Sequence, residues 1–148
     1  ARYLLVRPHV VLHFGWQHKP NILSVYTDSG WAGCVRTRKS TSGGVVMRGS
    51  RVLKTWSTTQ AAVALSSAEA ELIALVKGAA EGLAVTSLLR DLHEDVTVYV
   101  GVDSSAAIGV CRRTGVGKLR HLDTRLLWVQ AMVRPGSIVV ETVGGGEC

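Results

Sequence analysis

The sequence lacks acidic residues over two long stretches. Between Ser29 and Ala68 there is no aspartate or glutamate, whereas six arginine and lysine residues occur there. From Cys111 to Arg134 there are six more basic residues, and Asp123 is the single acid. With a net charge of +6 over 148 residues, such a chain attracts polyanions, of which nucleic acid is the commonest. A basic surface that only keeps the protein in solution is the alternative interpretation.

Cysteines are few and widely separated. Cys34, Cys111 and Cys148 are odd in number and fit no zinc-binding spacing, so they favour a reduced protein. No signal peptide is visible, because the residues at positions 7–9 interrupt the early apolar residues. We therefore expect an intracellular protein, in a cytoplasmic particle or the nucleus, that is not secreted.

The sequence also has no long uninterrupted apolar run. Its most apolar segment, "LIALVKGAAEGLAVTSLL", is broken by Lys77 and Glu81, which predicts a buried helix and no membrane span. Internal repeats, low-complexity tracts and a convincing linker are missing as well. A content of 47% hydrophobic and 19% charged residues is typical of a globular chain, and the length suits one domain.

Hydrophobic periodicity predicts a mixed α/β domain. The element order is βββαβααβ, in which the first three strands form an antiparallel meander and "RGS" marks a hairpin turn. Strands paired first as a meander and then joined through helices imply a mixed sheet with helices packed on it. The predicted elements are strands at 22–28, 43–47 and 51–57, a helix at 66–90, a strand at 96–103, helices at 104–113 and 121–133, and a strand at 137–143.

Two carboxylates stand at predicted strand ends. Asp28 ends the first strand and Asp103 ends the fourth, and each is followed by serine. In a sheet built around these two strands, both acids can project into one crevice. Because like charges a few ångströms apart repel, the pair favours a divalent cation such as Mg²⁺ between them. Taken singly, Asp28 could be a turn former and Asp103 a helix cap.

The long helix offers a third acid in "SSAEAEL". Glu69 lies three residues after Ser66, so a capping box explains it. Glu71 lies about 200° further round the helix and begins an apolar run. A glutamate beside a buried face is costly unless it is paired or ligates a metal. We therefore favour Glu71 as the third acid, with a solvated helix residue as the alternative.

Four segments carry a family resemblance. In order between residues 26 and 143, "YTDSGWAGCVRTRKSTSGGVV", "ALSSAEAELIAL", "VDSSAAI" and "RHLDTR" resemble the ribonuclease H domain of copia-type (Ty1-like) LTR retrotransposon polyproteins. The start, "ARYL", resembles the segment that connects such a domain to the polymerase. Residues 1–20 are then expected to be a remnant of that connection, and residues 21–148 a ribonuclease H-like domain truncated at its C-terminus.

The resemblance implies a fold, an activity and a set of ligands. The fold is RNase H-like, with a mixed five-stranded sheet and helices on both faces. The activity is hydrolysis of the RNA strand of RNA–DNA hybrids during reverse transcription, next to a reverse transcriptase polymerase domain in the parent polyprotein and without a membrane partner. Two Mg²⁺ ions, for which Mn²⁺ can substitute, are implied, with Asp28, Glu71 and Asp103 as the first three ligands. The alternative is a catalytically impaired or domesticated module that binds hybrid or duplex nucleic acid.

The fourth acid and the substrate contacts are less defined. In the family the fourth acid lies on a helix after the last strand, which is expected beyond Cys148. Asp123 is either a substitute ligand or an ion-pair partner of Arg120 or Arg125. The expected nucleic-acid contacts are Ser66, Ser67, Ser104, Arg38 and Lys39.

Two glycines run against the helix prediction. Gly78 and Gly82 each weaken the long helix by roughly 1 kcal/mol relative to alanine, unless close packing requires them.

Overall fold

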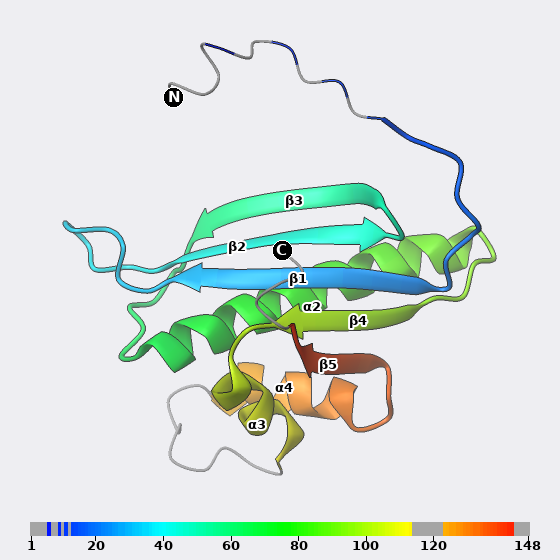
Figure 1. The fold of residues 1–148 in the computed structure, drawn as a ribbon. Coiled ribbons are helices and arrows are strands. Elements are labelled where there is room, and N and C mark those ends of the chain that lie inside the picture. The colour runs from blue at the N-terminus through cyan, green and yellow to red at the C-terminus, as the bar shows by residue number, and fades with distance from the viewer. Residues whose placement is uncertain (1–5, 7–8, 10, 12, 114–122, 144–148) are drawn as a thin grey trace.

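The computed structural model describes residues 6, 9, 11, 13–113 and 123–143, and for residues 123–127 the backbone alone. The described elements follow the predicted order (Figure 1). They are β1 (Ile22–Gly30), β2 (Thr41–Arg48), β3 (Arg51–Thr59), α2 (Ser67–Asp91), β4 (Thr97–Val102), α3 (Ser105–Arg112), α4 (Asp123–Val133) and β5 (Ile138–Thr142).

The five strands form one open mixed sheet in the order β3-β2-β1-β4-β5. β1 pairs antiparallel with β2, and β2 antiparallel with β3. β4 runs parallel to both β1 and β5. The predicted hairpin turn lies between β2 and β3, where Gly49 adopts a φ of +61°, a conformation that glycine adopts at little cost. The predicted mixed five-stranded sheet is thus confirmed.

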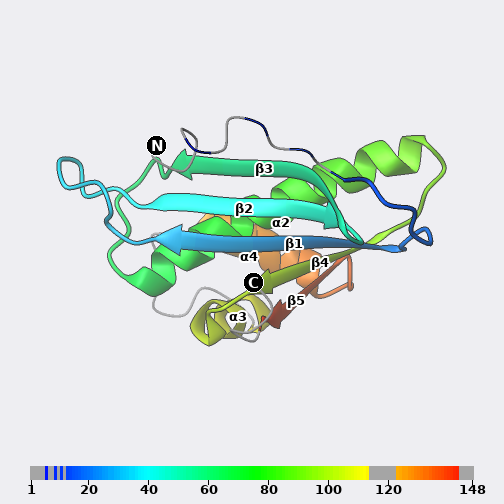
Figure 2. The same ribbon diagram turned by 45° about the horizontal axis from the view of Figure 1, so that its top comes forward.

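The core lies on one face of the sheet. Figures 1 and 2 show α2 and α4 on the same side of the strands, and α3 packs against α4, α2 and β5. Alternate strand residues point into this layer, and all three helices contribute to the same buried cluster. Its members include Leu23, Val25, Val98, Val100, Ile138 and Val140 from the strands and Leu75, Ile108 and Val129 from the helices.

The helix arrangement therefore differs from the expectation of helices on both faces. Side chains of the opposite parity, such as Tyr26 and Tyr99, lie outside the buried cluster and are half-exposed. Since side chains alternate between the two sides of a strand, they belong to the other face of the sheet. The both-faces arrangement came from the family resemblance, and no helix among the described residues covers that second face.

Helix α2 packs closely against the sheet at two glycines. A Cβ atom on Gly78 would lie 2.2 Å from Thr27 Cγ2, and one on Gly82 would lie 2.8 Å from Val98 Cγ1 and 2.9 Å from Val25 Cγ2. The two glycines are thus needed for close packing. This explains why residues of low helix propensity occur inside α2. By length and composition α2 could cross a membrane, but its buried residues pack on β1, β2 and β4, so it is a core helix, as predicted.

The segment before β1 is held by hydrogen bonds to the end of the sheet where β2 ends and β3 begins. Gln17 donates a hydrogen bond to the Arg48 carbonyl and accepts one from the Ser50 backbone, both at 2.9 Å. Arg48 Nε donates to the Pro20 carbonyl at 3.0 Å. Glu94 forms ion pairs there with Lys19 and Arg48, and these two bases lower the pKa of its carboxyl group, Lys19 most. The predicted domain boundary at residue 20 stays a prediction.

Candidate active site at the ends of β1 and β4

Asp28 lies in β1 on the side opposite α2. Leu23, Val25 and Thr27 alternate toward the buried layer, so Asp28 faces the other way and is exposed. Its Oδ1 accepts a hydrogen bond of 2.7 Å from the Ser29 backbone N–H. β1 continues to Gly30 and pairs Asp28 with Gly43 of β2. The residue is therefore part of the strand and not the turn former that the sequence also allowed.

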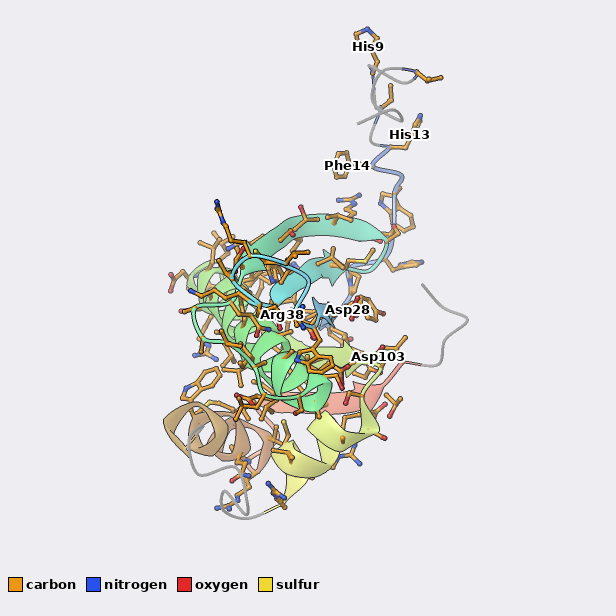
Figure 3. All side chains as sticks on the ribbon, turned by 90° about the vertical axis from the view of Figure 1, so that its left-hand side faces the viewer. His9, His13, Phe14, Asp28, Arg38 and Asp103 are labelled. Carbon is orange, nitrogen blue, oxygen red and sulfur yellow. The ribbon has the colours of Figure 1, made fainter. Side chains whose placement is uncertain are left out.

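Asp103 follows β4 directly and lies next to Asp28. The parallel register pairs Tyr26 with Gly101, so two residues further each chain reaches one of the aspartates. Neighbouring strands lie about 4.8 Å apart, and side chains two residues apart share a face. Figure 3 views this end of the sheet and shows Asp28 and Asp103 beside each other. The predicted placement of both acids at one end of the sheet therefore agrees with the register.

Ser104, and not Asp103, caps the next helix. Its Oγ accepts a hydrogen bond of 3.2 Å from the Ala107 backbone N–H at the start of α3. The capping role that the sequence allowed for Asp103 is thus filled by its neighbour. Because Asp103 is exposed and is not needed as a cap, its carboxylate is available to a ligand.

Glu69 and Glu71 have different environments at the start of α2. Ser66 is the N-cap, and its Oγ accepts a hydrogen bond of 3.2 Å from Glu69 N. Glu69 Oε2 accepts one of 2.9 Å from Leu65 N, and only 4% of Glu69 is exposed. The capping interpretation of Glu69 is confirmed, except that its carboxylate reaches the residue before the N-cap.

Glu71 lies on the side of α2 that faces the sheet. It precedes Gly78 by seven residues, or about two helical turns, so the two residues point in nearly the same direction. Gly78 contacts Thr27, and Glu71 lies about 10 Å nearer the helix start, at the level where β1 ends. Glu71 is half-buried. Figure 1 shows that α2 starts at the end of the sheet where β1 ends. Because Glu71 lies in the first turns of α2, the helix geometry places it at the same end of the sheet as Asp28 and Asp103.

These three acids have no basic partner among the described residues. The ion pairs there join Glu94 to Lys19 and Arg48, and Glu81 to Lys54. Two neighbouring carboxylates without a cation are electrostatically unfavourable, and hard carboxylate oxygens are the ligands that Mg²⁺ prefers. The donor chemistry and the charge imbalance fit a divalent metal.

The side chains do not form a closed metal-binding cluster in this conformation. Within residues 13–113 and the other described residues, no three His, Cys, Asp or Glu side chains lie close enough together to hold an ion. The fold brings the backbone positions of the three acids to one end of the sheet, but it does not bring all three carboxylates into coordination distance of one ion. The ligand roles of Asp28, Glu71 and Asp103 therefore stay predictions.

The predicted fourth acid is only partly described. Asp123 is the first residue of α4, and its side chain is outside the described part, as are Lys118 and Arg120. A helix start favours a carboxylate, which is compatible with either role that the sequence suggested. Its part in metal binding stays a prediction.

The candidate nucleic-acid contacts lie on loops and helix starts. Ser66 and Ser67 are exposed, and Arg38 is exposed on the loop between β1 and β2 with a φ of +56°. In that loop, Arg38 N donates to the Cys34 carbonyl at 2.7 Å, which forms a tight turn. Lys39 is half-buried.

The same loop also carries Cys34. A hydrogen bond with the Thr37 side chain is the main cause of a lowered pKa of the Cys34 thiol.

Comparison with known proteins identifies the family. No protein-family model matches the chain. Among solved structures, LC11-RNase H1, isolated from compost, superposes with a TM-score of 0.63 at 19% identity, covering 84% of this chain and 86% of that one. The N-terminal RNase H domain of a Mycobacterium tuberculosis protein gives 0.60 at 17% identity, covering 85% and 84%. These likenesses show the fold.

A curated relative decides the family. The retrovirus-related Pol polyprotein from transposon TNT 1-94 of Nicotiana tabacum is 31% identical over 130 residues, which are 85% of this chain. The chain belongs to the ribonuclease H-like domains of retrotransposon Pol polyproteins. The resemblance drawn from the sequence is confirmed. This domain spans only 10% of the length of that polyprotein.

A viral protease–reverse transcriptase shows the same fold. The foamy viral protease–reverse transcriptase in complex with an RNA/DNA hybrid matches with a TM-score of 0.59 at 12% identity, covering 95% of this chain and 20% of that one. LC11-RNase H1 in complex with an RNA/DNA hybrid matches with a TM-score of 0.53 at 19% identity.

Proposed function

We propose that this domain is a Mg²⁺-dependent endonuclease that hydrolyses the RNA strand of RNA–DNA hybrids during reverse transcription. The observation that carries the proposal is the placement of three acids at one end of the sheet. Asp28 and Asp103 lie at the ends of neighbouring parallel strands. Glu71 lies on the side of α2 that faces the sheet. None of them has a basic partner among the described residues. The family and the hybrid-bound structural neighbours support the same reaction.

Asp28, Glu71 and Asp103 would hold the metal. When bound, Mg²⁺ or Mn²⁺ lowers the pKa of a water molecule and stabilises the charge on the leaving oxygen. Asp28 would bind the metal from β1, next to Asp103 at the end of the neighbouring strand β4. Asp123, or an acid beyond Cys148, would complete the set.

The starts of α2 and α3 would contact the substrate. Ser66 Oγ already accepts the Glu69 N–H, but its own hydroxyl proton remains able to donate to a phosphate or a ribose 2′-hydroxyl. The Ser104 hydroxyl has the same property in α3, and Ser67 is exposed beside Ser66. Free N–H groups at a helix start favour an anion. Arg38 and Lys39 would add contacts to the nucleic-acid backbone.

The reaction would take place inside the cell and within a larger polyprotein. We propose a reverse transcriptase polymerase domain as the partner, since the relative that matches is a Pol polyprotein and a viral neighbour is a protease–reverse transcriptase.

The test is cleavage of an RNA–DNA hybrid labelled on the RNA strand. With Mg²⁺ the domain should release RNA fragments. Asp28→Asn should lower the cleavage rate by more than about 100-fold, because changes outside the ligand set typically cost about 10–100-fold in activity. Asp95→Asn is the matched control, because it removes the same charge from an exposed aspartate that precedes β4. A folded domain that cleaves with neither Mg²⁺ nor Mn²⁺ would contradict the proposal.

A second candidate function is binding without catalysis. It is favoured by the lack of a closed three-ligand cluster in the described residues, together with the exposed basic loop. This module would bind hybrid with an affinity that falls steeply as salt rises and would not cleave it, so Asp28→Asn would have no effect on product. The cleavage assay therefore separates the two functions.

A further inference from the structure

Gln60 is a buried amide that joins three segments near the candidate active site. It follows β3 directly and is 5% exposed. Its backbone N–H donates to the Ser40 carbonyl at 2.8 Å. Its side-chain Nε2 donates to Ser42 Oγ at 2.9 Å and to the Ala70 carbonyl at 2.8 Å. One residue thus connects the strand β2, its preceding loop and the first turns of α2.

The partners of Gln60 adjoin the predicted metal ligands. The Ala70 carbonyl belongs to the peptide group that links Ala70 to Glu71, so the amide holds the backbone at that acid. Ser42 pairs with Ser29 across β2 and β1, one step along from the pair of Asp28 and Gly43. The Gln60 side chain therefore lies between the backbone of Glu71 and the strand position next to Asp28.

Two other hydrogen bonds tie the same segments together. Ser40, which is fully buried, accepts the Ala32 N–H on its Oγ at 3.0 Å. Trp31 Nε1 donates to the Ala64 carbonyl at 3.2 Å. Both bonds start from the turn after β1. The Trp31 bond reaches the segment just before α2, and the Ser40 bond joins the Gln60 network through the Ser40 carbonyl.

The role of Gln60 depends on its donor group. Ala70 and Ser42 are 0% and 2% exposed, so water cannot easily replace the amide if it is removed. Gln60 Oε1 has no partner among the described residues. An apolar side chain of similar size would fill the space but would leave the relative positions of α2 and β2 to packing alone.

We propose that Gln60 is a positioning residue that fixes Glu71 relative to Asp28 for metal binding. The inference rests on the proposed function. Its specific consequence is that loss of the amide weakens divalent-metal binding even when the domain remains folded. Gln130 supplies the contrast: it is 2% exposed, and its Nε2 donates to the Val110 carbonyl at 2.9 Å, joining α4 to α3. Neither helix carries Asp28, Glu71 or Asp103, the acids whose relative positions the Gln60 amide would fix. Asp123, the candidate fourth acid, begins α4 about two helical turns before Gln130.

The experiment compares Gln60→Leu, Ser42→Ala and Gln130→Leu with the unmodified domain. Mn²⁺ affinity is measured by electron paramagnetic resonance, cleavage by its dependence on Mg²⁺ concentration, and folding by thermal unfolding. Gln60→Leu should weaken Mn²⁺ binding about 10–100-fold, as outer-shell changes do, and should raise the Mg²⁺ concentration for half-maximal cleavage by a similar factor. Ser42→Ala removes one of the two acceptors, so a smaller loss is expected, and it serves as the test if Gln60→Leu does not fold.

Gln130→Leu should unfold at a lower temperature but bind Mn²⁺ as the unmodified domain does. If folded Gln60→Leu and Ser42→Ala also bind Mn²⁺ like the unmodified domain, the positioning role is wrong while the proposed function stands. If Gln130→Leu weakens Mn²⁺ binding as much as Gln60→Leu does, the effect is general loosening and the positioning role is again wrong. If the unmodified domain binds no Mn²⁺, the proposed function fails and this role fails with it.

Discussion

Replacing Gly78 with alanine tests how closely α2 must lie on β1. The new Cβ would be 2.2 Å from Thr27 Cγ2 and 3.3 Å from Val25 Cγ1. Both neighbours are buried, and both are β-branched side chains with restricted χ1 angles. Neither can swing aside into open space, so the helix itself has to move away from the strand.

The expected change in stability is a balance of two terms. Alanine is favoured over glycine inside a helix by about 1 kcal/mol. Extra atoms in a well-packed core cost typically about 1–3 kcal/mol, and a distance of 2.2 Å places this site at the upper end. We expect a net loss of about 1–2 kcal/mol in the free energy of unfolding.

Gly109→Ala is the matched control in α3. This glycine is helical and exposed, and a Cβ there would meet nothing within 4 Å. The same substitution should therefore stabilise the domain by about 0.5–1 kcal/mol. Urea denaturation of both variants measures the free energy of unfolding, which should fall for Gly78→Ala and rise for Gly109→Ala. Equal stabilisation by Gly78→Ala and Gly109→Ala would refute the close packing of α2 on β1.

The shift of α2 should also affect catalysis. Thr27 precedes Asp28, and Glu71 lies on the same side of α2 as Gly78, so a displaced helix moves the two acids apart. We expect Gly78→Ala to need more Mg²⁺ for half-maximal cleavage, whereas Gly109→Ala should not.

Two further predictions concern charge. Lys19 and Arg48 lower the pKa of Glu94 from its usual value of 4.5, so this interaction stabilises the fold above that value and the stabilisation disappears as pH falls through the lowered pKa. Urea denaturation between about pH 7 and pH 3 should therefore show a smaller loss of stability for Glu94→Gln than for the unmodified domain, and equal losses would contradict the pairing. Replacing Arg38 and Lys39 by alanine should reduce the slope of log affinity against log salt for hybrid binding by about 1 for each basic side chain that binds a phosphate, and an unchanged slope would remove this loop from the interface.

The element order and the strand-end acids could be predicted because local patterns determine them. Alternating apolar residues mark β4, and helical spacing marks α2. The strand ends were harder: β2 starts at Thr41 and β3 ends at Thr59, beyond the predicted limits. Those polar residues resemble a loop in sequence, but they pair with each other across the two strands.

Features that depend on tertiary contacts could not be read from one sequence. Gln60 looks like an ordinary polar residue between a strand and a helix, because its three acceptors come from Ser40, Ser42 and Ala70. The closeness of Gly78 to Thr27 likewise depends on how α2 docks. The sequence raised close packing as a reason for the glycines, but only the docked helix establishes it.

The most direct test of the proposed metal site is a crystal structure of the domain grown with Mn²⁺ and measured at a wavelength that gives an anomalous signal from manganese. We predict an anomalous peak within coordination distance of the Asp28 and Asp103 carboxylates, with Glu71 turned toward it. A well-ordered structure in which manganese is bound elsewhere, or in which these carboxylates bind none, would contradict the proposal.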